Sequence, residues 1–193
     1  NDVDWTVVGK EQPTEFTGYE ECSSKVKIIK YKQDGEHCEI VLDRTPFYAE
    51  SGGQVGDMGF LKDKEFLFKV EDVQKSEDEF IHFGVVESGD IQNVQSVEAQ
   101  INNERRKQIQ RNHTATHILH QALKEVLGEH VQQAGSLVSD KSLRFDLTHY
   151  EKILDSQIEE IEARVNTVIL ENRIVETEMK NYKVACEEGA VSL

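Results

Sequence analysis

Along the first hundred residues, apolar and polar positions alternate with a period of two, the pattern of strands that bury one face. Segments 26–28 and 38–42 flank Asp34 and Gly35, a pair typical of a tight hairpin turn. The alternation recurs in segments 66–70, 80–83 and 97–101. Five or six short strands separated by frequent glycines predict a small antiparallel β-barrel.

The period changes near residue 103 to that of an amphipathic helix. Segment 104–127 contains no proline or glycine, Asn102 and Asn103 can cap its first turn, and Gly128 is placed to end it. The apolar positions of this segment form one stripe, made of Ile118, Leu119, Ala122, Leu123, Val126 and Leu127. A helix with one buried face is therefore expected.

A second helix is predicted after residues 148–151, where Thr148 and Glu151 have the spacing of a capping box. Its apolar positions recur in steps of four and three, which favours a buried stripe made of Leu154, Ile158, Ile161, Val165 and Val168. Segments 143–147 and 174–178 alternate like strands. The second half is thus expected to pack helices on a small sheet.

Together these patterns predict an α+β chain, with a small antiparallel β-barrel followed by an α/β domain. The expected parts are a lead-in at 1–20, the barrel at 21–101 and the α/β domain at 102–193. The chain begins at asparagine and ends without a polar tail, so we expect a piece of a longer protein whose second domain is truncated at its C-terminus.

The net charge of the chain limits which kinds of partner it can bind. The 193 residues carry 22 basic and 37 acidic side chains, a net charge of −15, which disfavours general affinity for nucleic acid. Segment 103–111 is locally basic, so a local phosphate contact remains open. No apolar run approaches the roughly 20 residues of a membrane helix, and no leader pattern is present. The three cysteines lack paired spacing, which favours a reducing compartment, and the prediction is a cytoplasmic protein without membrane contact.

Three histidines fall on one face of the first helix. His113, His117 and His120 lie at positions i, i+4 and i+7, and the first two have the spacing of a metal-binding helical pair. Thr114 stands where a zinc protease has its glutamate, which excludes that class. No Cys/His partner follows at short spacing, because Cys186 has glutamates beside it. The pair therefore predicts either half of a metal site or ordinary surface and core histidines.

Glycine clusters once, in segment 45–59, at positions 52, 53, 56 and 59. Without a Cβ, glycine permits tight turns and close approach of the backbone to a ligand. The segment is thus either a corner of the barrel or part of a binding site.

Several longer motifs together resemble the editing domain of alanyl-tRNA synthetases. They are Arg-Asn-His-Thr-Ala-Thr-His-Ile-Leu-His at 111–120, His-Val-Gln-Gln-Ala-Gly-Ser at 130–136 and Leu-Arg-Phe-Asp at 143–146. Segment 45–59 is similar to the glycine-rich motif of the barrel that precedes this domain in the family. The resemblance covers almost the whole chain, and it implies the second-additional-domain fold shared by threonyl- and alanyl-tRNA synthetases.

Two related groups resemble the chain less closely. Free-standing alanyl-tRNA deacylases typically show Pro-Glu-Gly-Gly-Gly-Gln where this chain has Ala-Glu-Ser-Gly-Gly-Gln at 49–54. Editing domains of threonyl-tRNA synthetases share the histidine pair but lack the glycine-rich barrel. A free-standing deacylase and a noncatalytic tRNA-binding module remain the alternative functions.

The resemblance implies that the parent enzyme attaches alanine to its tRNA in a domain absent from this chain, using ATP and magnesium. Alongside the parent's other domains, this region would hydrolyse alanine-specific tRNA that has been mischarged with serine or glycine at its acceptor end. Zinc would be held by His113, His117 and a Cys-x-x-x-His pair beyond Leu193. We therefore expect the fragment to bind zinc weakly or not at all and to be inactive or weakly active alone.

The family motifs also imply roles for individual residues. Thr116 and Gln133 take the catalytic positions, where their polar groups can interrogate the seryl hydroxyl. The substrate-binding positions are Gly52, Gly53, Gln54, Arg105 and Arg106, with the two arginines as phosphate contacts. Ordinary structural roles remain open for these residues, and Arg144 with Asp146 is expected to form a structural ion pair or a strand cap.

Overall fold

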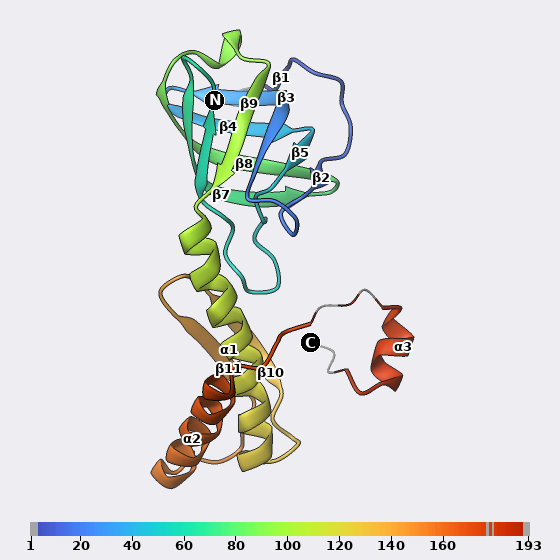
Figure 1. Ribbon diagram of the computed structural model, residues 1–193, viewed down its shortest axis with the longest axis vertical. Coiled ribbons are helices and arrows are strands. Elements are labelled where there is room, and N and C mark those ends of the chain that lie inside the picture. The colour runs from blue at the N-terminus through green and yellow to red at the C-terminus, as the bar shows by residue number, and fades with distance from the viewer. Residues whose placement is uncertain (1–3, 177, 179, 191–193) are drawn as a thin grey trace. The chain divides into compact units, whose positions relative to one another are not determined.

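The chain divides into two compact units. The computed structural model describes residues 4–176, 178 and 180–190 (Figure 1). The first unit comprises Asn1–His113 with Leu137–Leu143, and the second comprises Thr114–Ser136 with Arg144–Leu193. The division falls inside helix α1 (Asn103–Leu127), so this one helix contributes to both units.

Six antiparallel strands of the described chain close into a barrel in the first unit (Figure 1). Around the barrel they are β3 (Ser23–Asp34), β4 (His37–Leu42), β8 (Glu79–Ser88), β7 (Leu67–Ser76), β6 (Gly59–Lys62) and β9 (Ser96–Ile101). The pairing of β9 with β3, in which Val26 lies opposite Val97, closes the ring. Strand β1 (Thr6–Val7) adds to β3 from outside. The predicted small antiparallel barrel is confirmed.

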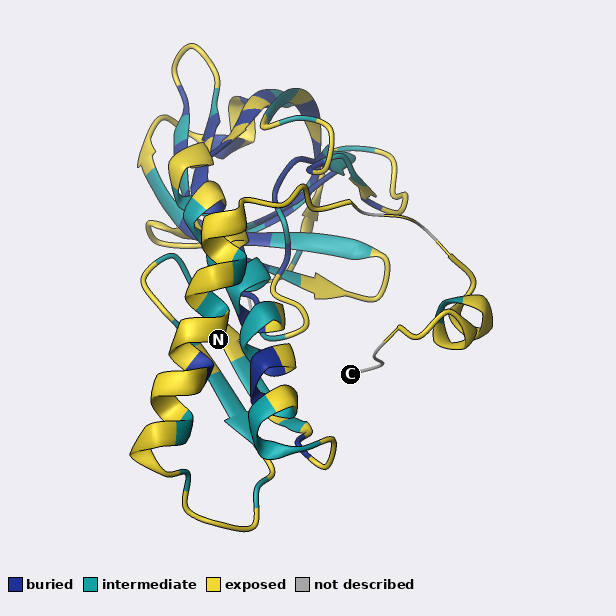
Figure 2. Cartoon of the chain, turned by 60° about the horizontal axis from the view of Figure 1, so that its bottom comes forward, coloured by how far each residue is buried: buried dark blue, intermediate teal, exposed yellow. Residues whose placement is uncertain are grey.

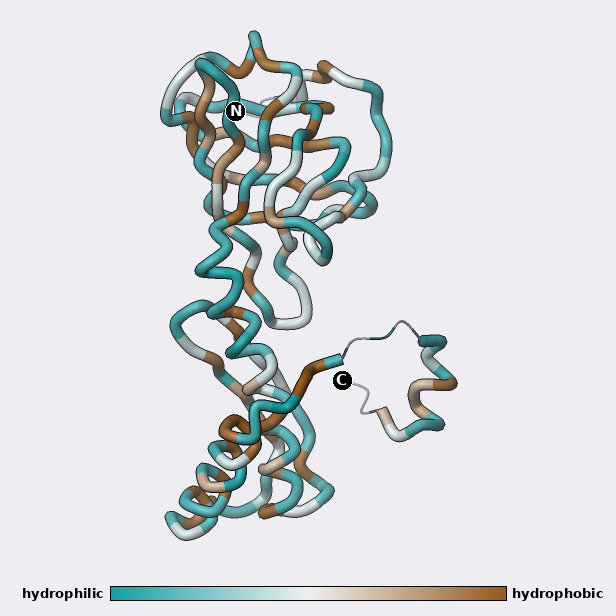
Figure 3. Tube along the Cα trace, in the orientation of Figure 1, coloured by the Kyte–Doolittle hydropathy of each residue, from teal (hydrophilic) through white to brown (hydrophobic). Residues whose placement is uncertain are grey.

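The interior of the barrel is apolar because alternate residues of every strand point inward. Ile40, Leu61 and Phe68 have no exposed surface, and each such side chain contributes roughly 1.5–3 kcal/mol to folding. Figure 3 shows the alternation as brown and teal along the strands, and Figure 2 shows the buried positions inside. Gly84 marks a close approach of β8 to β7, since a Cβ there would lie 1.9 Å from the carbonyl oxygen of Lys69.

Short elements complete the first unit. Strand β2 (Glu15–Phe16) pairs in parallel with β5 (Arg44–Thr45). The 3₁₀ turn η1 (Ile91–Asn93) leads into β9, and Asp90 caps it by accepting a hydrogen bond from the backbone N–H of Gln92 at 3.0 Å. Asn102 caps α1, as expected, because its Oδ1 accepts from the N–H of Arg105 at 3.0 Å.

The second unit packs the C-terminal half of α1 and helix α2 (Asp155–Glu171) on a two-stranded sheet. The sheet consists of β10 (Gln133–Val138), whose last two residues belong to the first unit, and β11 (Leu143–Leu147). The core contains Ala122, Leu123, Val131 and Ile161, with Phe145 and Leu147 of β11 against them. The predicted strand at 143–147 is therefore confirmed. A short helix, α3 (Tyr182–Glu187), follows.

The predicted capping box at 148–151 is wrong. Thr148 instead continues the pairing of the sheet, because its N–H donates to the carbonyl of Gln132 and its hydroxyl accepts from the N–H of Gln132. Helix α2 begins only at Asp155, after the N-cap Leu154, whose N–H donates to Gln157 Oε1 at 2.9 Å. The Thr148 hydroxyl is bonded to Gln132 and therefore does not cap the helix.

Two further expectations for the C-terminal part need correction. The buried stripe of α2 holds for Ile161 and for Val165, which packs against the core, whereas Leu154 and Ile158 are 58% and 44% exposed. Most of α2 is coloured as exposed in Figure 2. The expected strand at 174–178 is absent at its described positions, and Thr177 lies outside the described residues. Ile174 and Val175 are 88% and 69% exposed, so the apolar side chains of this segment bury no face that would hold a strand against the sheet.

None of the helices described here is long and apolar enough to span a membrane.

Candidate functional site

The glycine-rich segment forms a tight turn at its centre. The N–H of Ser51 donates to the carbonyl of Gln54 at 3.1 Å, and the N–H of Gln54 donates to the carbonyl of Ser51 at 3.0 Å. Gly52 and Gly53 between them have φ values of 58° and 81°. Left-handed backbone at both central positions is what a type I′ turn requires, and glycine adopts it without strain. This explains the paired glycines.

The turn is fastened to Val138 in the same unit. The N–H of Val138 donates to the carbonyl of Gly53 at 2.7 Å, and the N–H of Val55 donates to the carbonyl of Val138 at 3.1 Å. The segment is thus a loop between β5 and β6 that leaves the barrel and is fixed by backbone hydrogen bonds. This bonding holds Gln54 in a defined position.

The side chain of Gln54 meets the histidine helix. Gln54 is 6% exposed, and its Oε1 lies 2.7 Å from Nδ1 of His113, which is 59 residues away in sequence. Because an amide oxygen only accepts, Nδ1 of His113 carries the proton and donates. A histidine that binds a metal generally donates its other ring N–H to an oxygen in this way, which fixes the ring and its tautomer.

The histidine pair meets part of the requirements of a zinc site. His113 and His117 lie one turn apart on α1, and His117 is exposed. Among the residues that the structure describes, no three or more His, Cys, Asp or Glu side chains gather as a metal site. The chain thus offers two imidazoles with the correct helical spacing, one of them oriented by Gln54, and further ligands would have to come from elsewhere.

His120 belongs to the core of the second unit. It is 7% exposed, its ring lies 5.0 Å from that of Phe145, and burial lowers its pKa, with the Lys124 charge acting in the same direction. Its Nε2 has no hydrogen-bond partner within the described part of the chain. This histidine fills a packing position.

Arg106, a predicted phosphate contact, is engaged inside the first unit. It is 6% exposed and pairs with Asp57, itself 1% exposed, through Nε and Nη2. Nη1 donates to the carbonyl of Gly18 at 2.9 Å, and Nη2 also donates to the carbonyl of Pro46 at 3.0 Å. The guanidinium is therefore occupied in joining the start of α1 to two loops of the barrel.

Arg105 is also engaged within the first unit. Its Nε donates to Asp140 Oδ1 at 3.1 Å, and its Nη1 donates to the carbonyl of Gly56 at 2.8 Å. The side chain is 16% exposed. These bonds hold the loop before β6 and the turn after β10 against α1, which leaves little of the guanidinium for a phosphate.

The two residues expected at catalytic positions lie in the second unit. Thr116 is 5% exposed on α1. Gln133 begins β10, where its Nε2 donates to Ser136 Oγ at 3.5 Å. Arg144 and Asp146 form the expected ion pair on β11, with 3.2 Å between Nε and Oδ2.

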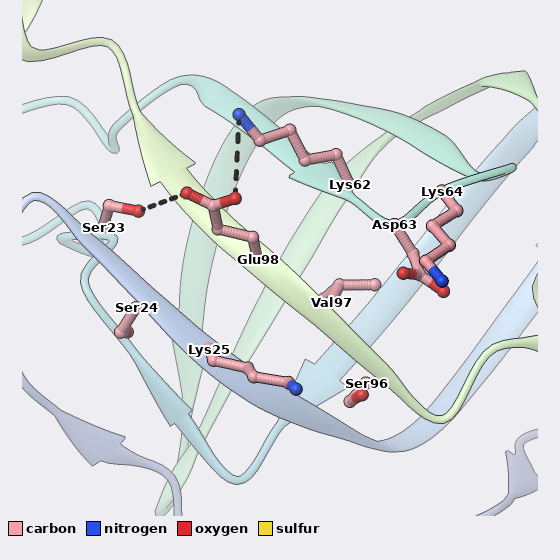
Figure 4. Close-up of a pocket in the computed structure, with 9 residues that line it drawn as sticks. All are labelled: Ser23, Ser24, Lys25, Lys62, Asp63, Lys64, Ser96, Val97 and Glu98. Atoms are coloured by element: carbon pink, nitrogen blue, oxygen red, sulfur yellow. Dashed lines mark hydrogen bonds and ion pairs between the residues drawn. The ribbon is translucent and has the colours of Figure 1, made fainter.

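A separate hollow of about 600 Å³ lies on the outer surface of the barrel, over β3, β9 and β6 (Figure 4). Glu98 crosses it, accepting a hydrogen bond from Ser23 and pairing with Lys62. None of the predicted site residues lines this hollow. Because the hollow contains none of the residues that carry the family motifs, we do not place the functional site there.

Sequence reasoning missed Asp57 and Asp140, the acidic partners of the two arginines. A signal for the first pair was present: Arg106 lies three residues before Ile109, so both project from one face of α1, and Ile109 is fully buried. A charged residue on a buried helix face requires a partner of opposite charge.

The chain belongs to the class II (A) tRNA synthetases, because the family model described as tRNA synthetases class II (A) matches residues 2–105, more than half of its length. It is similar to the alanine-tRNA ligase of Thermoanaerobacter sp. (strain X514), with 47% identity over 189 residues and 93% of this chain. It is 45% identical over 192 residues to that of Legionella pneumophila (strain Lens), and 43% identical over 190 residues to that of Acaryochloris marina (strain MBIC 11017). The chain spans 22% of the length of these relatives.

Proposed function

We propose that this chain is part of an alanine-tRNA ligase and contributes to hydrolytic editing, in which tRNA mischarged with serine or glycine loses its amino acid. The similarity to alanine-tRNA ligases over 93–95% of the chain supports the parent enzyme. The observation that carries the editing role is the 2.7 Å contact between Gln54 and His113, which joins the glycine-rich loop to the histidine helix.

In this proposal, water attacks the ester carbonyl and the 3′ oxygen of the tRNA leaves with a proton. Gln54 is a positioning residue, because it holds the ring of His113 through Nδ1. Thr116 and Gln133 are the candidates for selecting serine, since a buried polar partner favours a substrate hydroxyl over a methyl group. The net charge of −15 disfavours an extensive contact with phosphates, so in this proposal the chain contacts only the single-stranded acceptor end of the tRNA. Other domains of the parent hold the tRNA body.

His113 and His117 are the residues that would hold zinc, together with ligands from outside this chain. When bound, zinc supplies Lewis-acid polarisation of water or the ester, or a fixed point for the terminal adenosine. The bond from Nδ1 of His113 to Gln54 fits this assignment, because it leaves the ring in one tautomer and orientation.

The editing role is tested by Gln54→Ala in the full-length ligase. Hydrolysis of seryl-tRNA should fall about tenfold, which is what a group hydrogen-bonded to a metal-binding histidine typically contributes. Charging with alanine should stay within about twofold, because another domain carries it. Gln92→Ala, at an exposed position on η1, is the matched control and should change neither rate. Equal loss of charging and hydrolysis would assign Gln54 to stability, and unchanged hydrolysis would favour a noncatalytic tRNA-binding module.

The zinc assignment is tested by calorimetric titration of zinc into this chain and into the full-length ligase. Two imidazoles are half of a tetrahedral shell, so we expect the full-length protein to bind zinc at least about tenfold more tightly. His113→Ala should weaken binding in both, whereas His37→Ala, at an exposed position on β4, should not. Equally tight binding by the short chain would mean that it completes the site with its own residues.

A further inference from the structure

Four aromatic side chains line a pocket of about 250 Å³ in the first unit, next to the glycine-rich turn. They are Phe16, Tyr19, Tyr48 and Phe80, joined at the rim by Lys75. The lining continues through residues 49–51, directly before Gly52. None of these aromatic residues has a role in the proposed hydrolysis.

Phe16 is the centre of this cluster. Its ring stacks on that of Phe80 with 5.7 Å between centroids and 4° between planes. The rings of Tyr19 and Tyr48 stand nearly perpendicular to it, at 5.0 and 6.1 Å. The cluster thus presents aromatic edges and faces in several orientations, and such ring pairs hold one another in place.

Backbone hydrogen bonds fix the segments that form the pocket. The N–H of Thr17 donates to the carbonyl of Thr45 at 2.9 Å, and that of Glu50 donates to the carbonyl of Val73 at 2.8 Å. The segment that contains Phe80 is fixed as well, because the N–H of Phe80 donates to the hydroxyl of Thr14 at 3.2 Å. The pocket is therefore preformed, as ligand sites usually are.

Two features of the rim indicate the kind of ligand. Tyr19 is 86% exposed although its ring lies against Phe16, so one of its faces meets solvent. The ammonium group of Lys75 lies 5.7 Å from the centre of the Phe80 ring. An exposed ring beside a cation is the combination that proteins use to stack an unpaired base and to hold the adjoining phosphate.

We propose that this pocket binds one unpaired nucleobase of an RNA strand whose end approaches the glycine-rich turn. The volume is below the range of roughly 300–1,000 Å³ typical of larger ligands, which suits a single base. Binding through phosphate alone is disfavoured, because Glu50 also lines the pocket with its carboxylate bonded to Gln74. That the strand is the acceptor end of a tRNA rests on the proposed function.

The test is binding of a fluorescein-labelled four-nucleotide RNA, ACCA, to this chain, followed by fluorescence anisotropy. Tyr19→Leu should raise the dissociation constant about fivefold to tenfold, because stacking on one aromatic ring is lost. Tyr19→Phe keeps the ring and should stay within about twofold of the unchanged chain. Phe60→Leu, which removes an exposed ring on β6 outside the pocket, is the matched control and should have no effect.

Several results would overturn this assignment. Absence of RNA binding, or equal affinity of the Tyr19→Leu chain, would show that the pocket does not hold a base. Equal affinity for the same sequence in a blunt duplex would point to phosphate contacts, and AMP competing as strongly as the RNA would identify a free nucleotide as the ligand. Because this assay has no hydrolytic step, it can fail while the hydrolysis assay with Gln54→Ala still supports editing.

Discussion

Replacing Arg106 with methionine is expected to lower the free energy of unfolding of the first unit by about 3–5 kcal/mol, since removing one partner of a buried ion pair leaves an uncompensated charge. Asp57 is 1% exposed, and besides Arg106 its carboxylate accepts from the N–H of Tyr48 at 2.8 Å. The carbonyl groups of Gly18 and Pro46 would also lose their donors. Several groups are therefore left unsatisfied by one substitution.

Urea denaturation followed by the fluorescence of Trp5, the single tryptophan, reports on the first unit, to which that residue belongs. Arg111→Met is the matched control on the same helix, because Arg111 pairs with Glu104 at 3.8 Å with both side chains about two-thirds exposed. Arg111→Met should lower the free energy of unfolding by less than about 1 kcal/mol.

A double variant separates charge burial from packing. Asp57→Asn with Arg106→Met removes both charges, and the amide oxygen of Asn can still accept from the N–H of Tyr48. The double variant should therefore unfold less readily than Arg106→Met alone. If it is the less stable of the two, the loss arises from packing and carbonyl contacts rather than from the isolated carboxylate.

The barrel was predictable because most positions of its long strands keep a period of two. The exceptions are register shifts in β3 and β7 and the three consecutive buried residues Ile40, Val41 and Leu42 of β4. Strand ends were less predictable: β7 continues to Ser76, and β3 continues to Asp34, through residues that are polar on both faces and carry no hydrophobic signal. The start of α2 was predicted wrongly for a different reason. Thr148 has the correct local spacing for a cap, but a non-local bond to Gln132 takes its hydroxyl, and local patterns do not contain such bonds.

In the candidate site, too, local patterns were predictable from the sequence and non-local contacts were not. Helical periodicity alone predicts that His113 and His117 share a stripe. The contact of His113 with Gln54 joins segments 59 residues apart, and nothing in the sequence predicted it. The basic cluster shows the limit of charge counting, because Arg106 contributes to a local excess of positive charge in sequence but is neutralised by Asp57 inside the fold.

A second buried polar group makes the barrel sensitive to acid. His82 on β8 has no exposed surface, and its burial lowers the pKa from 6.5 to about 4, despite backbone hydrogen bonds to Ile40 and Phe80 that act in the opposite direction. Nδ1 lies 3.0 Å from the carbonyl oxygen of Ile40, so this nitrogen carries the proton. Nε2 lies 2.7 Å from the hydroxyl of Thr45 and accepts from it. The geometry fits the neutral ring.

This pKa predicts that the first unit loses stability between about pH 6.5 and pH 4. Below pH 6.5 the unfolded chain binds a proton at His82 while the folded chain does not, so acidification favours unfolding. The contribution is fully present above pH 6.5 and is lost as the pH falls to about 4, where the folded ring is also protonated. A difference of this size corresponds to about 3 kcal/mol.

His82→Gln isolates this contribution, because glutamine keeps a polar side chain at the position but does not titrate in this range. We expect the variant to be less stable than the unchanged chain at pH 8, and the gap to narrow by about 3 kcal/mol as the pH falls to 4. Urea denaturation at each pH unit, followed by Trp5 fluorescence, measures both curves. Carboxylates titrate in the same window but contribute equally to both proteins, so they cancel in the difference.

His37→Gln, at an exposed position on the neighbouring strand β4, controls for removing one imidazole. Parallel curves for His82→Gln and the unchanged chain would show that His82 is protonated as readily in the folded barrel as in the unfolded chain.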